Sequence, residues 1–262
     1  MKFVQLPQKD TIFLSKVNST SMYISNELET TIKELQQLDS LNSFYLAGGS
    51  NLAIRYSHRE SIDIDLFCEN IIGVSGFELI EKEIKETFKD RVLSITYPTK
   101  QNDELVFLRT IISTNKTNIK VEIIQGFKLF NPIELINEIR LASEIDIGLF
   151  KLDSITNRYA EKDLYDLDYI TENRNHSLNK LMELYEKRKS YYIENEINTI
   201  FSLSNEYCPI ENTELLILEN HKKDKERIPF HSESKLKNNK TLLTYHKSNW
   251  KIKVNTYLKE NK

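Results

Sequence analysis

The sequence is poor in cysteine and glycine and has no long hydrophobic run. Its two cysteines, Cys68 and Cys208, lie far apart and form no metal-ligand spacing, so we expect a reduced, cytoplasmic protein. The first thirty residues carry several charges and no continuous apolar stretch. We therefore expect neither a signal peptide nor a membrane span there. Only six glycines occur in the chain, so an adjacent pair of them is informative.

The composition is that of a globular protein, with 39% hydrophobic and 29% charged residues. A chain of 262 residues can form one large domain or two small ones. The net charge of −3 hides an asymmetry, because lysine and arginine outnumber aspartate and glutamate by 12 to 4 from His221 to Lys262. Such a basic tail on an acidic body indicates a polyanionic partner. A solvated tail without a partner explains the same charge pattern equally well.

The stretch from Phe44 to Phe67 combines two strands with a glycine turn. An apolar strand precedes the turn, one or two helical turns follow it, and a second strand ends the stretch. In that second strand Ile62, Ile64 and Leu66 alternate with two aspartates, so the pleat predicts an apolar face and an acidic face. Two like charges on one face repel each other, and a cation between them relieves the repulsion. Mg²⁺ suits this position because one or two carboxylates plus phosphate oxygens hold it.

The glycine turn itself has the features of a phosphate site. Gly48 and Gly49 can adopt backbone angles closed to other residues and let the main chain approach a ligand. The amides that follow them, together with the Ser50 hydroxyl, are suited to hold a triphosphate. The sequence therefore predicts a phosphate-binding turn shortly ahead of an Asp-x-Asp metal site, Asp63 and Asp65. A glycine hairpin beside a solvated acidic strand is the structural alternative.

Gly49-Ser50 followed by Asp63-Ile64-Asp65 resembles the signature of the DNA polymerase beta-like nucleotidyltransferase superfamily. The longer string YLAGGSNLAIRYSHRESIDIDLF is similar to one branch, the AbiEii/AbiGii-type nucleotidyltransferase toxins and their MenT-type relatives. In this string an arginine, Arg55, and a second basic patch, His58 and Arg59, separate the two halves. The resemblance spans about residues 40 to 175.

Beyond this stretch, hydrophobic periodicity predicts a mixture of helices and strands. A helix is expected between Ser19 and Leu38, and another from Phe77 to Phe88. Three strands should follow, the last two joined by a hairpin turn, and the third carries Glu122 among apolar neighbours. Glu122 stands in the order in which the superfamily places its third acidic residue, so the resemblance makes it a candidate third metal ligand, or a base for the nucleophile. An edge-strand glutamate paired with a lysine is the alternative.

A helical half is expected from Ser143, with an aspartate three residues later in a capping arrangement. The string DIGLFKLDSITNRYAEKDLYDLDYI resembles the second conserved block of the toxin family. The resemblance makes Lys151 the conserved lysine and Asp163 the later acid, with Asp166 beside it, while Arg158 and Lys162 are the accompanying basic positions. A surface network of charged helix pairs is the structural alternative. Further helices are expected from Leu178 and over residues 191–203.

We expect Mg²⁺-dependent transfer of a nucleoside monophosphate from an NTP, with two aspartates on the metal and basic side chains on the triphosphate. Either Arg55 or Arg59 would join Lys151 in neutralising the triphosphate. The resemblance implies an RNA acceptor, the 3′ end of tRNA, and a cognate antitoxin, with no membrane partner. A protein or a small hydroxylated acceptor, or a non-catalytic nucleotide-binding or partner-binding module, are the alternatives. The candidate catalytic residues are Asp63, Asp65, Glu122, Lys151 and Asp163; the candidate metal ligands are Asp63, Asp65 and Glu122; the candidate nucleotide-binding residues are Gly48, Gly49, Ser50, Arg55, Arg59, Lys151 and Asp166.

These predictions combine into an α+β fold, a polymerase-beta-like mixed sheet flanked by helices and followed by a helical C-terminal domain. We expect a catalytic domain over residues 1–142, a helical domain completing the site over 143–205, and a basic extension over 206–262. In that extension Tyr245, Trp250 and Tyr257 stand among lysines. They could stack on unpaired bases or anchor the tail against the body.

Overall fold

The computed structural model describes residues 24–172, 176–221 and 240–261 of the protein. Its centre is a seven-stranded sheet of order β3-β4-β5-β2-β1-β7-β6. Strand β1 runs antiparallel to β2 and parallel to β7, and β2 runs parallel to β5. This mixed sheet with its flanking helices confirms the predicted α+β fold class. The strands are β1 (Tyr45–Leu46), β2 (Ile64–Phe67), β3 (Val92–Lys100), β4 (Val106–Ser113), β5 (Asn118–Ile124), β6 (Glu134–Ile136) and β7 (Ile139–Leu141).

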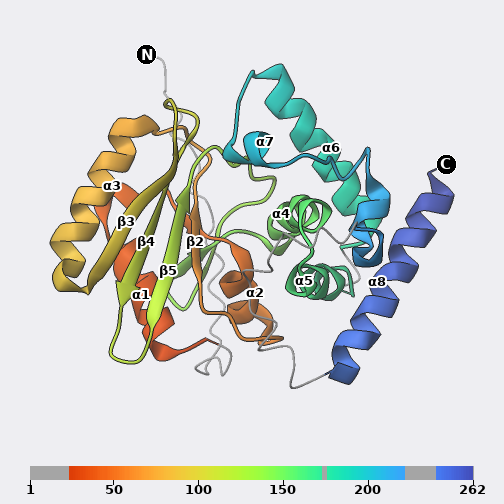
Figure 1. Ribbon diagram of the computed structural model, residues 1–262, viewed down its shortest axis with the longest axis horizontal. Helices are drawn as coiled ribbons and strands as arrows, with labels where there is room; N and C mark the ends of the chain where they lie inside the picture. Colours follow the sequence, from red (N-terminus) through yellow and green to blue (C-terminus); the bar gives the residue numbers. More distant parts are fainter. Residues whose placement is uncertain (1–23, 173–175, 222–239, 262) are drawn as a thin grey trace, which may run out of the picture.

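Two helices, α1 (Asn26–Gln36) and α3 (Gly73–Phe88), cover one face of the sheet (Figure 1). Helix α1 begins after Ser25, whose hydroxyl accepts a hydrogen bond from the Leu28 amide. The predicted start at Ser19 lies outside the described residues. The apolar positions of both helices are buried against the sheet and form one hydrophobic core with it, as their spacing predicts. In α3 these positions are Phe77, Ile80, Ile84 and Phe88.

The opposite face of the sheet meets a group of helices, and α2 (Gly48–Tyr56) lies between the two parts (Figure 1). Helix α4 begins at the predicted place, because the Ser143 hydroxyl accepts a hydrogen bond from the Asp146 amide. Phe67 and Phe127 from the sheet side stack at 4.6 Å and meet Phe150 of α4 edge-on, which joins the two parts through a second core. The helices are α4 (Glu144–Asn157), α5 (Glu161–Glu172), α6 (Leu178–Glu194), α7 (Ile200–Ser204) and α8 (Lys240–Glu260), with short 3₁₀ turns η1 (Asp39–Leu41), η2 (Lys89–Arg91), η3 (Thr213–Leu216) and η4 (Leu218–Asn220).

Two local expectations were wrong. Ile62 is 53% exposed, although alternation predicted it to share the buried face with Ile64 and Leu66. The reason is that pairing with β5 begins only at Ile64, so the pleat does not reach Ile62. The single helix expected over residues 191–203 is instead the end of α6 and the separate, short α7.

The C-terminal helix α8 was not predicted, since no clear apolar period runs through its sequence. Trp250 is fully buried, and its indole N–H donates to the Leu216 carbonyl at 2.8 Å. Trp250 is therefore an anchor rather than a platform for bases. No helix in the described ranges is both long enough and apolar enough to cross a bilayer. The division of the chain at residues 142 and 205 stays a prediction.

Candidate active site

The two aspartates of the Asp-x-Asp pattern lie where β2 begins. Asp65 is on the strand and faces Glu122 in the parallel register with β5. Burial, and then the negative charge of Glu122, raise the pKa of Asp65 to about 6, with a further contribution from Asp63. Three carboxylates thus gather at the meeting point of β2 and β5, and their crowding disfavours the charged form of Asp65.

Both carboxylate oxygens of Glu122 have cationic partners. Arg109 on β4 donates to one oxygen at 2.6 and 2.8 Å, and Lys120 donates to the other at 3.1 Å. Burial alone would raise the pKa of Glu122, but Lys120 and Arg109 together lower it. Glu122 is paired with a lysine, as the structural alternative proposed, yet β5 lies inside the sheet between β4 and β2 rather than at an edge.

The glycine turn at the start of α2 touches this carboxylate group directly. Gly48 has a positive φ of 62°, and a Cβ there would lie 1.9 Å from an oxygen of Asp65. A Cβ on Gly49 would lie 2.3 Å from the Arg59 guanidinium. Any larger residue would therefore push Asp65 or Arg59 out of place.

The Ser50 hydroxyl is turned toward the chain rather than toward open space. It is buried, donates to the carbonyl oxygen of Asp63 and lies 2.9 Å from the Ser61 hydroxyl. Ser50 therefore holds the segment that leads into β2. Its predicted contact with phosphate stays a prediction.

Helices α4 and α5 contribute a buried cluster of opposite charges. The Lys151 ammonium lies 2.7 Å from Asp163 and 2.8 Å from Asp166. Arg158 pairs with Asp163 at 2.7 Å, and Arg59 donates to both oxygens of Asp166 at 2.6 Å. The exposed fraction of both aspartates is 0%, so this network is not the surface arrangement that the structural alternative described.

The charged forms of the side chains in this cluster stabilise one another. Burial disfavours the ammonium form of Lys151, but Asp163 and Asp166 outweigh that effect and raise its pKa. Burial likewise opposes the charge on Asp166, yet Arg59 and Lys151 hold its pKa well below the ordinary value. Lys151 is therefore a permanent cation over the whole physiological pH range.

Two cavities meet at the carboxylates. One, of 520 Å³, is lined on part of its wall by Phe67, Phe107, Phe150 and Phe201, and elsewhere by polar and charged side chains. The other, of 500 Å³, is lined by cationic side chains. Both volumes are in the usual range for small-molecule sites. The cations of the second cavity are Arg59, Arg109, Lys120, Lys151, Arg158 and Lys162, and the residues common to both cavities are Asp65, Glu122, Lys151 and Arg158.

Arg55 does not belong to this group. Its guanidinium donates to Asn51, to the Ala142 carbonyl and to Glu134 on β6, and it lines neither cavity. Of the two arginines that the sequence offered for the triphosphate, the structure brings only Arg59 to the carboxylates.

Sequence reasoning missed two cations of the site, Arg109 and Lys120. Lys120 stands two residues before Glu122 and so shares its face of β5, which was a usable signal. Arg109 is opposite Glu122 in the antiparallel register of β4 and β5, and that register was not readable from the sequence.

Comparison with known proteins identifies the family. The model of the nucleotidyl transferase AbiEii toxin family, of type IV toxin–antitoxin systems, matches residues 32–229. The chain belongs to the AbiEii family. This result confirms the predicted resemblance and the enzyme class, a nucleotidyltransferase toxin of a toxin–antitoxin system. Helix α8 lies beyond the matched residues.

Two individual proteins are similar to parts of the chain. An uncharacterized protein of Aquifex aeolicus is 27% identical over 165 residues, which cover 63% of this chain and 75% of that protein. Among solved structures, the nucleotidyltransferase toxin MenT4 of Mycobacterium tuberculosis is similar with a TM-score of 0.38 and 18% identity. That similarity covers 56% of this chain and 58% of MenT4.

Nucleotidyltransferases such as the AbiEii proteins generally use a divalent metal ion, and the carboxylates suit one. Asp63 and Asp65 supply hard oxygen donors, and burial, followed by the negative charges of Glu122 and Asp63, raises the pKa of Asp65; a cation would offset the repulsion among these carboxylates. Within the described residues no three acidic, histidine or cysteine side chains are grouped to hold a metal ion. Two carboxylates with phosphate oxygens are nevertheless a usual Mg²⁺ environment. Glu122 would have to leave Arg109 and Lys120 to become a third ligand.

The crowding of the AbiEii carboxylates predicts a pH-dependent effect of Asp65→Asn. Because folding raises the pKa of Asp65 from 3.8 to about 6, the folded state loses stability as the pH rises from about 4 to about 6 and stays lower above it. Without divalent ions, Asp65→Asn should therefore unfold at a higher temperature than the wild type at pH 8 and at the same temperature near pH 4. Thermal unfolding at both pH values measures this, and an equal difference at both would contradict it.

Proposed function

We propose that this protein is the Mg²⁺-dependent toxin that transfers a nucleoside monophosphate from an NTP to the 3′ end of an RNA, and that tRNA is the acceptor. The observation that carries the proposal is the meeting of a cationic cavity and a cavity with a phenylalanine-lined wall at Asp65 and Lys151. The cationic cavity matches a triphosphate, and the phenylalanine-lined cavity matches a base or a sugar. The α-phosphate between them would therefore lie at the carboxylates.

The cationic cavity has one lysine that is suited to an anionic ligand. Lys162 forms no hydrogen bond or ion pair with any side chain of the described residues. Its burial, and then the charge of Lys151, lower its pKa to about 8. Asp163 raises the pKa of Lys162 but does not outweigh these two effects. A phosphate group beside Lys162 would offset them, because it would add further opposite charge.

In the proposed reaction Asp63 and Asp65 hold Mg²⁺, which when bound activates the attacking hydroxyl and stabilises the departing pyrophosphate. Lys151 neutralises charge on the triphosphate, and Asp163 and Asp166 keep that lysine in place. Arg59 and the amides of Gly48 and Gly49 bind phosphate oxygens. Glu122 completes the inner set as a base or third ligand, and the Ser50 hydroxyl steadies the Asp63 backbone beside the phosphates.

An exposed aromatic residue supports an RNA acceptor. Tyr159 is 49% exposed and stands directly after Arg158 and three residues before Lys162, both of which line the cationic cavity. Stacking on an aromatic ring between phosphate-binding cations is how proteins hold unpaired bases. The basic tail supports RNA less than its charge suggests, because Lys247 pairs with Glu161 and Lys253 with Asp168 inside the molecule.

Tyr159→Ala should therefore weaken RNA binding about tenfold, the effect of losing one stacked base, and leave NTP binding unchanged. Filter binding of tRNA and titration with NTP measure the two affinities. Phe130→Ala is the matched control, because Phe130 is 36% exposed and its amide bonds Asp146 at the other end of α4, about 20 Å away. An equal loss in both variants would contradict a stacking role for Tyr159.

The proposed function is tested by incubating the pure protein with each radiolabelled NTP in turn, with Mg²⁺ and with tRNA or cell lysate. Label at the 3′ end of tRNA is the expected result. Label in a protein or a small molecule would replace the RNA acceptor, and nucleotide binding without any label would indicate a binding module. Co-expression with the neighbouring gene product tests for the antitoxin, since growth should be restored only by its cognate partner.

A further inference from the structure

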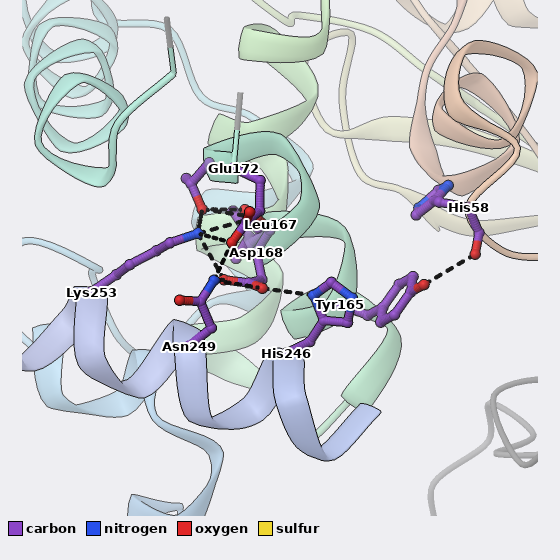
Figure 2. Close-up of polar contacts among 9 residues, drawn as sticks. His58, Tyr165, Leu167, Asp168, Glu172, His246, Asn249 and Lys253 are labelled. Atoms are coloured by element: carbon purple, nitrogen blue, oxygen red, sulfur yellow. Dashed lines mark hydrogen bonds and ion pairs between the residues drawn. The ribbon is translucent and has the colours of Figure 1, made fainter. Parts of the chain in front are cut away.

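We infer that α8 positions the active-site helix α5, and that Asp168 is the positioning residue through which it does so. Asp168 lies on α5 and its exposed fraction is 0%. Three side chains of α8 converge on its carboxylate (Figure 2): His246 at 2.6 Å, Asn249 at 3.0 Å and Lys253 at 2.8 Å. A carboxylate buried this deeply is thus satisfied entirely by the neighbouring helix.

Helix α5 is held on two opposite sides. Successive residues turn about 100° around a helix, so Asp166 and Asp168 project in nearly opposite directions. Asp166 pairs with Lys151 and Arg59 at the candidate active site, whereas Asp168 pairs with α8. A rotation or shift of α5 that followed the loss of α8 would therefore move Asp166 together with its two cations.

Tyr165 provides a second link from α8 to the site. Its ring meets the His246 ring at 4.5 Å and stacks on the His58 ring at 5.5 Å, and its hydroxyl donates to the His58 carbonyl at 3.1 Å (Figure 2). The other side of His58 reaches Asp166, with 2.8 Å between the histidine nitrogen and the carboxylate. The segment that carries Arg59 is therefore packed against α8 through one tyrosine.

The chemistry of Asp168 indicates a role in alignment rather than in adhesion. Trp250 and Val254 already bury the apolar side of α8 in the core. A buried ion pair adds little stability over apolar packing, but it can select one register. Because the donors of α8 are at positions 246, 249 and 253, only one placement of the helix along α5 brings all three to Asp168.

This inference rests on the proposed function only for its effect on NTP binding. The match of this chain to the AbiEii family model ends at residue 229, before α8 begins at Lys240. Helix α8 therefore adds a support that the family match does not include. The expected consequence is that NTP affinity depends on side chains of α8 that line neither of the two cavities.

The test uses the full chain with Asp168→Asn and the milder Lys253→Met. Trp250 is the only tryptophan of the sequence, so its emission wavelength and its quenching by acrylamide report on the docking of α8 alone. Hydrogen exchange of residues 57–61 reports on the Arg59 segment without any ligand. Titration with NTP and Mg²⁺ gives the affinity. Lys251→Met is the control, because Lys251 is an exposed lysine on the same helix. Lys253→Arg should behave like the wild type, because arginine keeps the charge.

We expect a shifted Trp250 emission, because a change of register alters the surroundings of the indole, faster exchange over residues 57–61 and NTP binding weakened about tenfold in Asp168→Asn, with smaller changes of the same kind in Lys253→Met. A shifted Trp250 emission with unchanged exchange and affinity would overturn the inference, and so would weakened NTP binding with unchanged emission and unchanged exchange over residues 57–61. If both variants match the wild type, Asp168 does not hold α8. If the wild type binds no NTP, the proposed function fails, and the exchange data still decide whether α8 orders the Arg59 segment.

Discussion

Asp65→Asn is expected to lower nucleotide transfer by about a thousandfold or more while the protein stays folded. Asp65 faces Glu122 across β2 and β5 and lines both cavities, so its loss removes a proposed metal ligand at the point where the α-phosphate would lie. The substitution also removes a negative charge from a crowded carboxylate group, and for this reason the fold should not suffer. Single-turnover transfer with labelled NTP, alongside thermal unfolding, measures both effects.

Glu69→Gln is a suitable control for Asp65→Asn. Glu69 follows the same strand two residues after its end, but it pairs with Lys128 at 3.0 Å and lines neither cavity. Glutamine keeps its acceptor for the Leu129 amide, so transfer and unfolding should both match the wild type. Transfer by Asp65→Asn within tenfold of the wild-type rate would exclude the metal-binding role of this aspartate.

Lys151→Met is expected to have the largest effect on stability. The ammonium is shared by two carboxylates with 0% exposure, Asp163 and Asp166. Removing one partner of a buried ion pair leaves a charge in a poorly solvated place, which costs about 3–5 kcal/mol. The free energy of unfolding, from urea titration followed by circular dichroism, should fall by this amount, and nucleotide transfer should be lost as well.

A double variant separates the two consequences of losing Lys151. In Lys151→Met with Asp163→Asn, one of the two carboxylates that lost the ammonium is removed, and its remaining partner Arg158 can turn toward solvent because its side chain is 42% exposed. The free energy of unfolding should therefore partly recover relative to Lys151→Met. Transfer should not recover, since the cation that faces the triphosphate is still absent. Recovery of transfer together with stability would show that Lys151 acts only through the fold.

Local patterns in the sequence predicted much of the core and of the site. Alternation at Ile64 and Leu66 predicted which face of β2 is buried, because side-chain direction in a strand changes with every residue. The Ser143 cap predicted the start of α4. The glycine pair predicted a close approach of the main chain, and Gly48 indeed leaves no room beside Asp65 for a Cβ. These features depend on neighbours within a few positions of the chain.

The partners of the charged residues were decided by the tertiary structure alone. Arg55 on α2 reaches Glu134 of β6, whereas Arg59, just after α2, reaches Asp166 of α5, so the placement of these distant elements decides which arginine joins the carboxylates. Glu122 lies opposite Asp65 only because β2 and β5 pair in one register.

Asp168 is the clearest case. From its place in the sequence it is one more acid in a charge-rich helix, and its partners stand about eighty residues further along the chain. Periodicity records which side of an element is buried, but it carries no information on which distant element will cover that side. The amino-acid sequence by itself therefore determined most of the elements and the family resemblance of this protein, while packing between remote segments decided which charges meet.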